Sequence, residues 1–257
     1  MVARADIINY CDDLLETSQF KDYCPNGLQV EGSGDVTKIV TGVTASQALI
    51  DAAIEASADM LLVHHGFFWQ GENPNIIGIK QRRIKHLLQA NINLVAYHLP
   101  LDAHPLLGNN AQLANVLNLE VEGRFGGSEG DSMAIAMHGR VVDKITAVQF
   151  AASISEALNR QVLHIAPDLE KKQSIQTVAW CTGAAQGYIE KAVELGVDAF
   201  ITGEASEQTA HIARESNIHF FAAGHHATER YGVKALGEHL SQHLDIDQCF
   251  IDIDNPI

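Results

Sequence analysis

The chain has 257 residues, of which 46% are hydrophobic, and its 17 basic and 32 acidic residues give a formal net charge of −15. This length suits one large core or two modest ones. No segment is apolar and long enough to span a bilayer, and the N-terminus lacks a basic region followed by an apolar one, so we expect a cytoplasmic protein without membrane contact. The negative charge argues against nucleic acid as a partner.

The four cysteines are spread along the chain, at Cys11, Cys24, Cys181 and Cys249. No two of them form a C-x-x-C pair. The sequence therefore predicts reduced thiols, and neither a disulfide framework nor a sulfur-rich zinc site is expected.

Helices and strands alternate through the first half of the chain. Apolar residues at helical spacing predict a helix over Ala5–Thr17, and Pro25-Asn26-Gly27 predicts a turn. The elements expected next are a strand at Lys38–Val43, a helix at Ser46–Ala56, a strand at Met60–Val63, a helix near Lys80–Ala90 and a strand at Asn93–Tyr97. This alternation indicates a largely parallel sheet with helices packed on its faces.

The second half repeats this alternation after a cluster of glycines from Gly123 to Gly130, which indicates a boundary or a flexible loop. The predicted elements beyond it are a strand at Ser132–Val142, a helix at Ile145–Leu158, a strand–helix–strand unit from Thr177 to Thr202, a strand at His219–Ala223, a helix at Ala227–His243 and a strand near Gln248–Ile253. The expected fold class is therefore α/β.

The two strand–helix–strand units resemble one another. A shift of 139 positions lays Lys38–Gly66 over Thr177–Ala205 without a gap, and six positions are then identical. Each copy is followed by a histidine with a carboxylate four residues later, at His98 and Asp102 in the first case and His225 and Glu229 in the second. Shared apolar periodicity alone produces some identities, but the matching histidine and carboxylate that follow each copy favour an internal duplication.

Chemically active residues follow several of these strands. In open parallel sheets the reactive groups gather outside the carboxyl ends of the strands. The residues predicted at such ends are His64, His65, His98, Asp102, Glu204, His225 and Glu229. Imidazole and carboxylate groups without thiolates suit iron, manganese, zinc, cobalt or nickel, so the pattern predicts a transition-metal site.

The backbone geometry of these positions bears on how they would bind metal. Neighbouring side chains on a strand point in opposite directions, so His64 and His65, if both are ligands, serve two ions or follow a turn that rotates one of them. Glu229 could bridge two ions about 3.5–4 Å apart, as in two-metal hydrolases. It shares a helix face with His225 if the helix begins there.

The glycine-containing segment G-A-A-Q-G at Gly183–Gly187 lies between a strand and a helix, where backbone amides can hold an anion. Its spacing matches neither a Walker loop nor a dinucleotide fingerprint, so we interpret it as a turn. No serine or cysteine lies in a nucleophile elbow, and covalent catalysis is not expected.

Five motifs together resemble one family from end to end, the Nif-three-like proteins, also called GTP cyclohydrolase I type-two homologues. These motifs are P-N-G-L-Q-V-E-G (Pro25–Gly32), V-H-H-G (Val63–Gly66), H-L-P-L-D-A (His98–Ala103), I-T-G-E (Ile201–Glu204) and G-H-H-A-T-E (Gly224–Glu229). The resemblance implies two divalent transition-metal ions per chain. The ligands that it implies are His64, His65, Asp102, His225 (rather than His226) and Glu229.

The resemblance also implies an architecture of two interleaved, pseudo-repeated α/β domains with mostly parallel sheets flanked by helices. We place the metal-binding domain at residues 1–126 plus 218–257 and the inserted second domain at 127–217. Members of the family resemble one another in forming a hexameric ring of dimers, so a homo-oligomer is expected.

The favoured function is metal-dependent hydrolysis of a small, nucleotide-like substrate through a metal-activated water. His98 and Glu204 are candidate proton carriers, or they support the ligands by hydrogen bonds. The alternative is a non-catalytic metal-handling or regulatory protein whose ring buffers, delivers or senses a metal. GTP cyclohydrolase activity is not expected, because that chemistry uses a zinc held largely by cysteines and we expect no cysteine beside the cluster.

Overall fold

The computed structural model describes residues 1–127, 134–168 and 174–257. Within these ranges the chain divides into two compact units: unit 1 comprises Met1–Gly108 and Gly232–Asp254, and unit 2 comprises Asn109–Tyr231 and Asn255–Ile257. The predicted domains, 1–126 plus 218–257 and 127–217, use other boundaries and stay a prediction. None of the described helices is both long and apolar enough to cross a membrane.

Unit 1 is built around a mostly parallel sheet. Its strands are β1 (Val2–Ala3), β2 (Gly27–Val30), β3 (Asp35–Val36), β4 (Lys38–Thr44), β5 (Met60–His65), β6 (Asn93–Ala96) and β13 (Asp247–Phe250). The main sheet has the order β13-β4-β5-β6-β2, in which only β2 runs antiparallel to its neighbour. The other two strands, β1 and β3, form a separate antiparallel pair.

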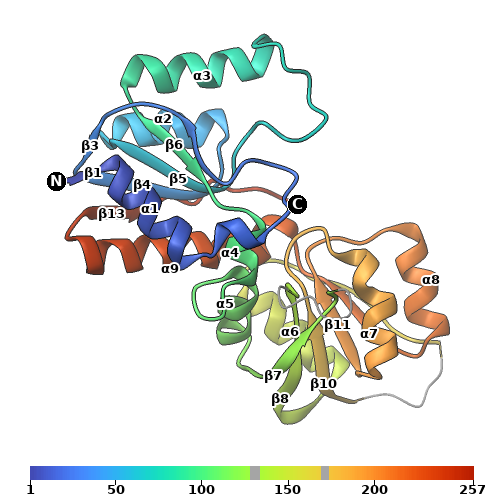
Figure 1. Cartoon of the computed structure of the whole chain (residues 1–257). Helices are drawn as coiled ribbons and strands as arrows, with labels where there is room; N and C mark the ends of the chain where they lie inside the picture. The colour runs from blue at the N-terminus through green and yellow to red at the C-terminus, as the bar shows by residue number, and fades with distance from the viewer. Residues whose placement is uncertain (128–133, 169–173) are drawn as a thin grey trace. The chain divides into compact units, whose positions relative to one another are not determined.

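Helices cover both faces of this sheet (Figure 1). They are α1 (Arg4–Leu14), the 3-10 turn η1 (Thr17–Gln19), α2 (Gln47–Glu55), α3 (Gly78–Ala90), α4 (Leu99–Ala103) and the last turns of α9 (His225–Leu244). Alternation along β5 explains the two layers: Leu61 and Val63 belong to the core shared with α2 and α3, whereas Met60 and Leu62 belong to the core shared with α1 and α9. The predicted helix-flanked α/β architecture is confirmed.

Unit 2 is built around a mixed sheet in the order β7-β8-β10-β11-β12-β9. These strands are β7 (Leu119–Phe125), β8 (Ala136–Thr146), β9 (Leu163–Ile165), β10 (Ser174–Trp180), β11 (Ala199–Thr202) and β12 (His219–Ala222). The central three, β10, β11 and β12, run parallel, and the outer pairings are antiparallel. Unit 2 therefore keeps a parallel centre at which the second strand–helix–strand unit lies.

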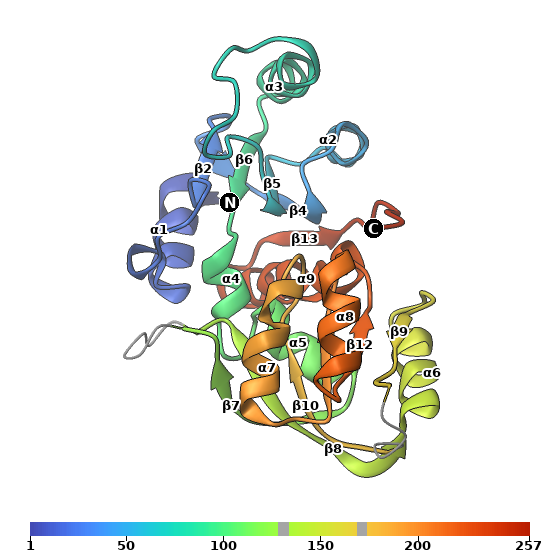
Figure 2. The same cartoon turned by 90° about the vertical axis from the view of Figure 1, so that its right-hand side faces the viewer.

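The helices of unit 2 are α5 (Asn109–Val116), α6 (Ala147–Ala157), the 3-10 turn η2 (Gln186–Tyr188), α7 (Ile189–Leu195), α8 (Glu207–Glu215) and the first turns of α9. One core joins the sheet to α5 and α6 through Leu113 and Phe150, and another joins its opposite face to α7 and α8 through Ile189 and Ala213. Figure 2 shows α7 and α8 side by side on their face of the sheet.

The glycine cluster begins inside a strand, so the alternative of a flexible loop is wrong at its start. β7 runs through Gly123 to Phe125 and pairs with β8, with a register shift between Val121 and Gly123. A Cβ on Gly123 would lie 2.6 Å from His138 Nε2, so the glycine permits a close approach inside a bulged strand. Positions 128–130 of the cluster, and residues 132–133 of the predicted strand, lie outside the described residues.

The predicted internal repeat is visible in matching hydrogen bonds. Asp59 Oδ2 accepts bonds from the backbone amides of Thr37 and Lys38, at 2.7 and 3.1 Å. Asp198 Oδ2, 139 positions later, accepts bonds from the amides of Gln176 and Thr177 at 3.0 Å each. An equivalent aspartate therefore anchors the start of the first strand in each of the two strand–helix–strand segments, as the predicted repeat requires.

Candidate metal centre

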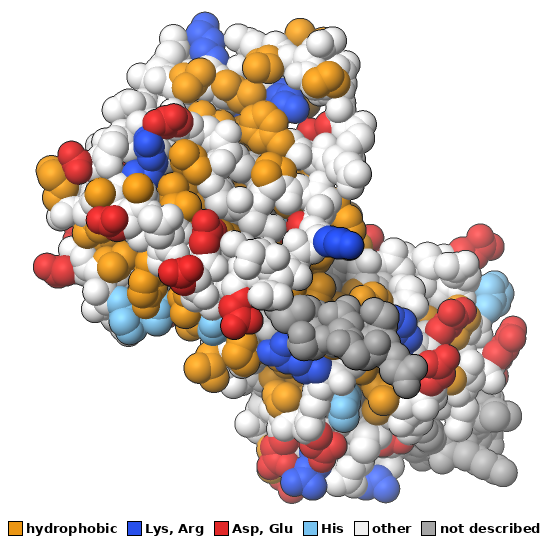
Figure 3. All heavy atoms as spheres, in the orientation of Figure 1, with side chains coloured by type: hydrophobic (Ala, Val, Ile, Leu, Met, Phe, Trp, Pro, Cys, Tyr) orange, Lys and Arg blue, Asp and Glu red, His pale blue; other side chains and the backbone are white. Residues whose placement is uncertain are grey.

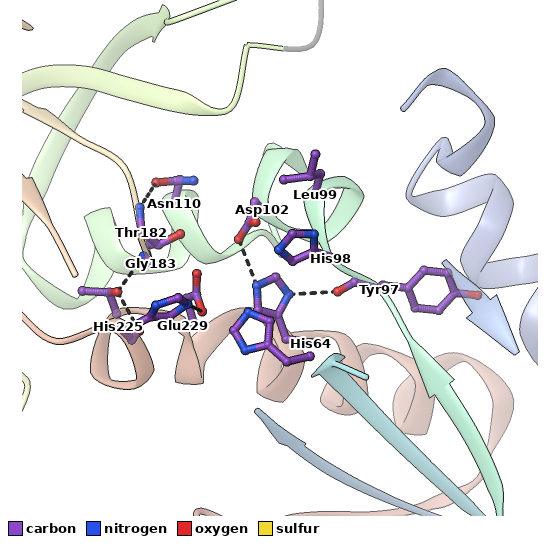
Figure 4. A network of polar contacts seen from close by, with 12 residues as sticks. His64, Tyr97, His98, Leu99, Asp102, Asn110, Thr182, Gly183, His225 and Glu229 are labelled. Atoms are coloured by element: carbon purple, nitrogen blue, oxygen red, sulfur yellow. Dashed lines mark hydrogen bonds and ion pairs between the residues drawn. The ribbon is translucent and has the colours of Figure 1, made fainter. Parts of the chain in front are cut away.

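The carboxyl ends of β5 and β6 bring the first group of candidate ligands together in unit 1. Val63 pairs with Ala96 in the parallel ladder, so the residues that follow both strands emerge at one edge of the sheet. His64 is fully buried there, and its Nδ1–H donates a 2.9 Å hydrogen bond to the Tyr97 carbonyl oxygen. Its other nitrogen, Nε2, lies 3.5 Å from Asp102 Oδ1 in α4 (Figure 4). The carbonyl therefore fixes the tautomer in which Nε2 carries the lone pair.

His65 lies beside His64 and not on the opposite side of the sheet. The centroids of the two rings are 4.4 Å apart, which agrees with the second of the two predicted alternatives, in which the chain rotates one of the histidines. His65 is the last residue of β5, so no further strand residue follows it. Its Nδ1 lies 3.3 Å from the Thr44 hydroxyl. The histidines thus present their rings together at the end of the strand.

His98 joins the two histidines from the segment that follows β6. Its ring centroid lies 5.2 Å from that of His64 and 5.6 Å from that of His65. Nitrogen atoms of all three rings lie within 4.8 Å of one another. His98 also immediately precedes α4, the short helix that carries Asp102. Four of the predicted site residues therefore gather within unit 1.

Asp22 holds His98 in place, although no motif or periodicity around Asp22 predicted this role. The His98 Nδ1–H donates to Asp22 Oδ1 at 2.7 Å, while Asp22 Oδ2 accepts bonds from Asn26 Nδ2 at 3.0 Å and from the Leu99 amide at 2.9 Å. Burial by itself would raise the pKa of Asp22, but the hydrogen bonds from His98, Asn26 and Leu99 lower it to about 2. Asp22 is thus an ionised carboxylate that orients the His98 ring.

Cys24 lies next to this carboxylate, contrary to our expectation that no cysteine would border the cluster. Its Sγ, an oxygen of Asp22 and a nitrogen of His98 lie within 4.8 Å of one another. Burial, followed by the charge and the hydrogen bond of Asp22, raises the pKa of the Cys24 thiol to about 12. One cysteine beside a histidine and a carboxylate does not make a sulfur-rich zinc site, which takes several cysteine ligands.

The second group of candidate ligands lies in unit 2, at the start of α9. The helix begins at His225, two residues earlier than predicted, so His225 and Glu229 share one face. His225 Nε2 lies 3.1 Å from Glu229 Oε2 (Figure 4). Its Nδ1–H donates a 2.7 Å bond to Glu204 Oε1. Burial by itself would lower the pKa of His225, but Glu229 and then Glu204 raise it to about 9.

Two glycines allow α9 to approach the strand ends so closely. A Cβ on Gly183 would lie 2.1 Å from Glu229 Oε1, and one on Gly203 would lie 2.6 Å from His225 Cα. Gly183 also has a φ of +68°, and its amide donates to Thr228 Oγ1 at 3.1 Å. The G-A-A-Q-G segment therefore serves as a tight turn under Glu229, and the amide of Gly183 is already committed within the protein.

The chemistry of these groups fits a bound cation. In both units an imidazole donates its Nδ1–H to an oxygen and directs Nε2 at a carboxylate: Asp102 for His64 and Glu229 for His225. A nitrogen lone pair and a carboxylate oxygen repel one another unless they share a cation, either a proton or a metal ion. Nitrogen and carboxylate donors whose partners fix the ring tautomer are typical of transition-metal sites.

The sequence matches the family described as DUF34/NIF3 (NGG1p interacting factor 3) over residues 2–256. The chain belongs to the DUF34/NIF3 family. It is 57% identical over 246 residues to a protein from Vibrio cholerae, and 52% identical over 255 residues to one from Pseudomonas aeruginosa. Both relatives are named GTP cyclohydrolase 1 type 2 homolog, and the matches cover 96% and 99% of each chain respectively. The resemblance inferred from the five motifs is confirmed.

Solved structures agree with this assignment. The structure of ybgI, a protein of unknown function, matches with a TM-score of 0.95 and 48% identity, and covers 100% of both chains. The protein TTHA1606 from Thermus thermophilus matches with a TM-score of 0.89 and 33% identity, again over 100% of both chains. The DUF34/NIF3 fold therefore extends over the whole chain.

Proposed function

We propose that this DUF34/NIF3 protein binds two divalent transition-metal ions and uses them to hydrolyse a small, nucleotide-like molecule. Its ligands in this proposal are His64, His65 and Asp102 from unit 1, with His225 and Glu229 from unit 2. The observation that carries the proposal is the pair of Nε2–carboxylate contacts, one in each unit, whose imidazoles are both fixed through Nδ1. Each contact can be bridged by a proton or by a metal ion, and with a metal ion in place of the proton the two contacts provide for two ions per chain.

Residues around the ligands supply the remaining functions. Ions of this type lower the pKa of a water molecule and hold the electrophile that it attacks. Glu204, predicted either as a proton carrier or as support, here fixes the ring of a ligand, and we assign it the supporting role because its carboxylate accepts the Nδ1–H of His225. His98 remains the proton carrier of the proposal: Asp22 orients it through Nδ1, and its Nε2 accepts or returns the proton.

The name shared by the relatives supports a nucleotide-like substrate but not a cyclohydrolase reaction in this chain. Among the described residues a single cysteine, Cys24, belongs to a group that could hold a metal, whereas cyclohydrolase chemistry uses a zinc held largely by cysteines. A hexameric ring of dimers also stays part of the proposal, and light scattering coupled to size-exclusion chromatography measures it directly.

Metal content measured by mass spectrometry, on untagged protein purified without chelators, tests the proposal. We expect about two ions per chain, a sharp fall in Glu229→Gln, and no change in His211→Ala, which alters an exposed histidine of α8. The loaded protein is then screened against nucleotides and phosphoesters. Metal content near zero after incubation with iron, manganese, zinc and nickel would refute the proposal. Bound metal without turnover, but with transfer to a metal-free acceptor protein, would establish the metal-handling alternative.

A further inference from the structure

Two aromatic side chains flank His98 in unit 1 and have no part in the proposed metal chemistry. The Trp69 ring meets His98 edge to face, with centroids 5.1 Å apart and planes at 87°, and lies 5.9 Å from the His65 ring. The Tyr23 ring meets His98 at 5.7 Å and 61°. Tyr23 is 57% exposed and Trp69 is partly exposed, so neither is simply a core residue.

The loop after β5 holds Trp69 in this position through a strained backbone. Phe68, the residue before it, has a φ of +105°, which non-glycine residues rarely adopt. Lys80 Nζ lies 4.6 Å from the centroid of the Phe68 ring and 3.5 Å from Glu72 Oε2, which secures this conformation. Strain of this kind is characteristic of functional sites, where the surrounding structure maintains it.

A backbone contact fixes the Tyr23 segment to the same loop. The Gln70 amide donates a 2.6 Å hydrogen bond to the Tyr23 carbonyl oxygen, next to Trp69 in sequence. Farther along the loop, Ile76 and Ile77 are 55% and 64% exposed, and hydrophobic side chains gather over α3 and this loop in Figure 3. Burial of apolar surface alone therefore does not explain why Trp69 turns toward the histidines.

The two tryptophans of the chain differ in a way that points to a ligand. Trp180 is fully buried, and its indole Nε1–H donates a 3.0 Å bond to the Asn110 carbonyl oxygen. Trp69 is partly exposed, and among the described residues its Nε1–H donates to no acceptor. Trp69 thus offers both an aromatic face and a hydrogen-bond donor beside the candidate metal ligands.

We propose that Tyr23 and Trp69 form an aromatic wall that binds the planar heteroaromatic ring of the substrate, a nucleobase. The inference rests on the proposed function and names the part of the substrate that unit 1 recognises. A base stacked on the indole uses its π face, while a ring acceptor takes the Nε1–H of Trp69. Because the centroids of the His65 and His98 rings lie 5.9 and 5.1 Å from that of the indole, the sugar or phosphate of the same molecule reaches the metal ligands.

Tryptophan fluorescence tests this wall directly, because the other tryptophan is buried. We titrate the full-length protein, metal-loaded and metal-stripped, with adenosine or guanosine, and correct for absorption with a free tryptophan derivative. Saturable quenching is expected with either nucleoside and none with ribose 5-phosphate. By calorimetry, Trp69→Phe should bind within about threefold of wild type, whereas Trp69→Leu should bind at least about tenfold more weakly. Tyr23→Ala, at an exposed position, should also weaken binding.

The outcomes separate this inference from the proposed function. Two ions and turnover without saturable quenching up to millimolar nucleoside, or a Trp69→Leu variant that binds like wild type, would overturn the aromatic wall alone. Saturable quenching in a protein that neither holds metal nor hydrolyses substrate would overturn the proposed function and leave the wall standing. Unchanged metal content and Trp180 emission in the variants confirm that they fold.

Discussion

Replacing Gly183 by alanine should disable the proposed metal ligands at the start of α9 while leaving the fold intact. The new Cβ would lie 2.1 Å from Glu229 Oε1 and 3.2 Å from His225 Nε2. The carboxylate is the end of a flexible side chain, so it moves aside and loses its position against the His225 ring. The left-handed φ of +68° adds strain of about 1–2 kcal/mol for a residue with a Cβ.

The backbone strain and the displacement of Glu229 can be measured separately. The strain should lower the Tm of the metal-free variant by about 2–8 °C, given about 2–4 °C per kcal/mol for a chain of this size. Displacement of Glu229 should weaken metal binding at least about tenfold, measured by competition with a chromophoric chelator. Gly187→Ala is the matched control, because no heavy atom lies within 4 Å of its added Cβ and its φ is not positive. A Gly183→Ala variant with wild-type metal affinity would refute Glu229 as a ligand.

Three further predictions concern the supporting carboxylates and the ions. Glu204→Gln should weaken metal binding by about 10–100-fold by loosening the His225 ring, whereas Glu207→Gln in α8 should not, and equal affinities would rule out the supporting role. Asp22 has a pKa lowered from 3.8 to about 2, so its stabilisation of the fold by about 2 kcal/mol is present above pH 4 and is lost as the pH falls through 2. The difference in unfolding free energy between wild type and Asp22→Asn should therefore shrink between pH 4 and pH 2. A difference that stays constant over this range would contradict the assignment of Asp22 as an ionised carboxylate. Chelation should lower the Tm in proportion to RT ln(1 + [metal]/Kd), and a Tm insensitive to chelator would argue against bound metal.

Much of the candidate centre was predictable because strand ends are local in sequence. Periodicity located β5, β6 and β12, and the rule that reactive groups follow parallel strands then selected His64, His98 and His225. The long-range supports were not predictable. Asp22 contacts His98 across 76 residues from a segment with no regular pattern, and nothing in that segment distinguishes it from an ordinary turn.

Element type was easier to predict than geometry within an element. Strand alternation left two alternatives for the paired histidines, opposite directions or a turn that rotates one of them. The rings of His64 and His65 lie 4.4 Å apart at the end of the strand, and the sequence alone could not decide between the two. Similarly, the glycine-rich stretch from Gly123 was interpreted as a boundary or a flexible loop, although a glycine inside a bulged strand has the same local signature.

The internal repeat explains why the two units offer different candidate ligands at equivalent places. The positions of Thr44, His64 and His65 in unit 1 correspond to Gly183, Gly203 and Glu204 in unit 2. In unit 1 the second strand of the repeat, β5, carries the imidazoles of His64 and His65. In unit 2 the two glycines remove the side chains that would collide with His225 and Glu229, so the helix after the third strand supplies the ligands instead. The remaining carboxylate, Glu204, occupies the place of an imidazole and orients one. Restoring a histidine at Gly203 would therefore not create a second copy of the first site, because its Cβ would lie 2.6 Å from His225 Cα and push α9 away.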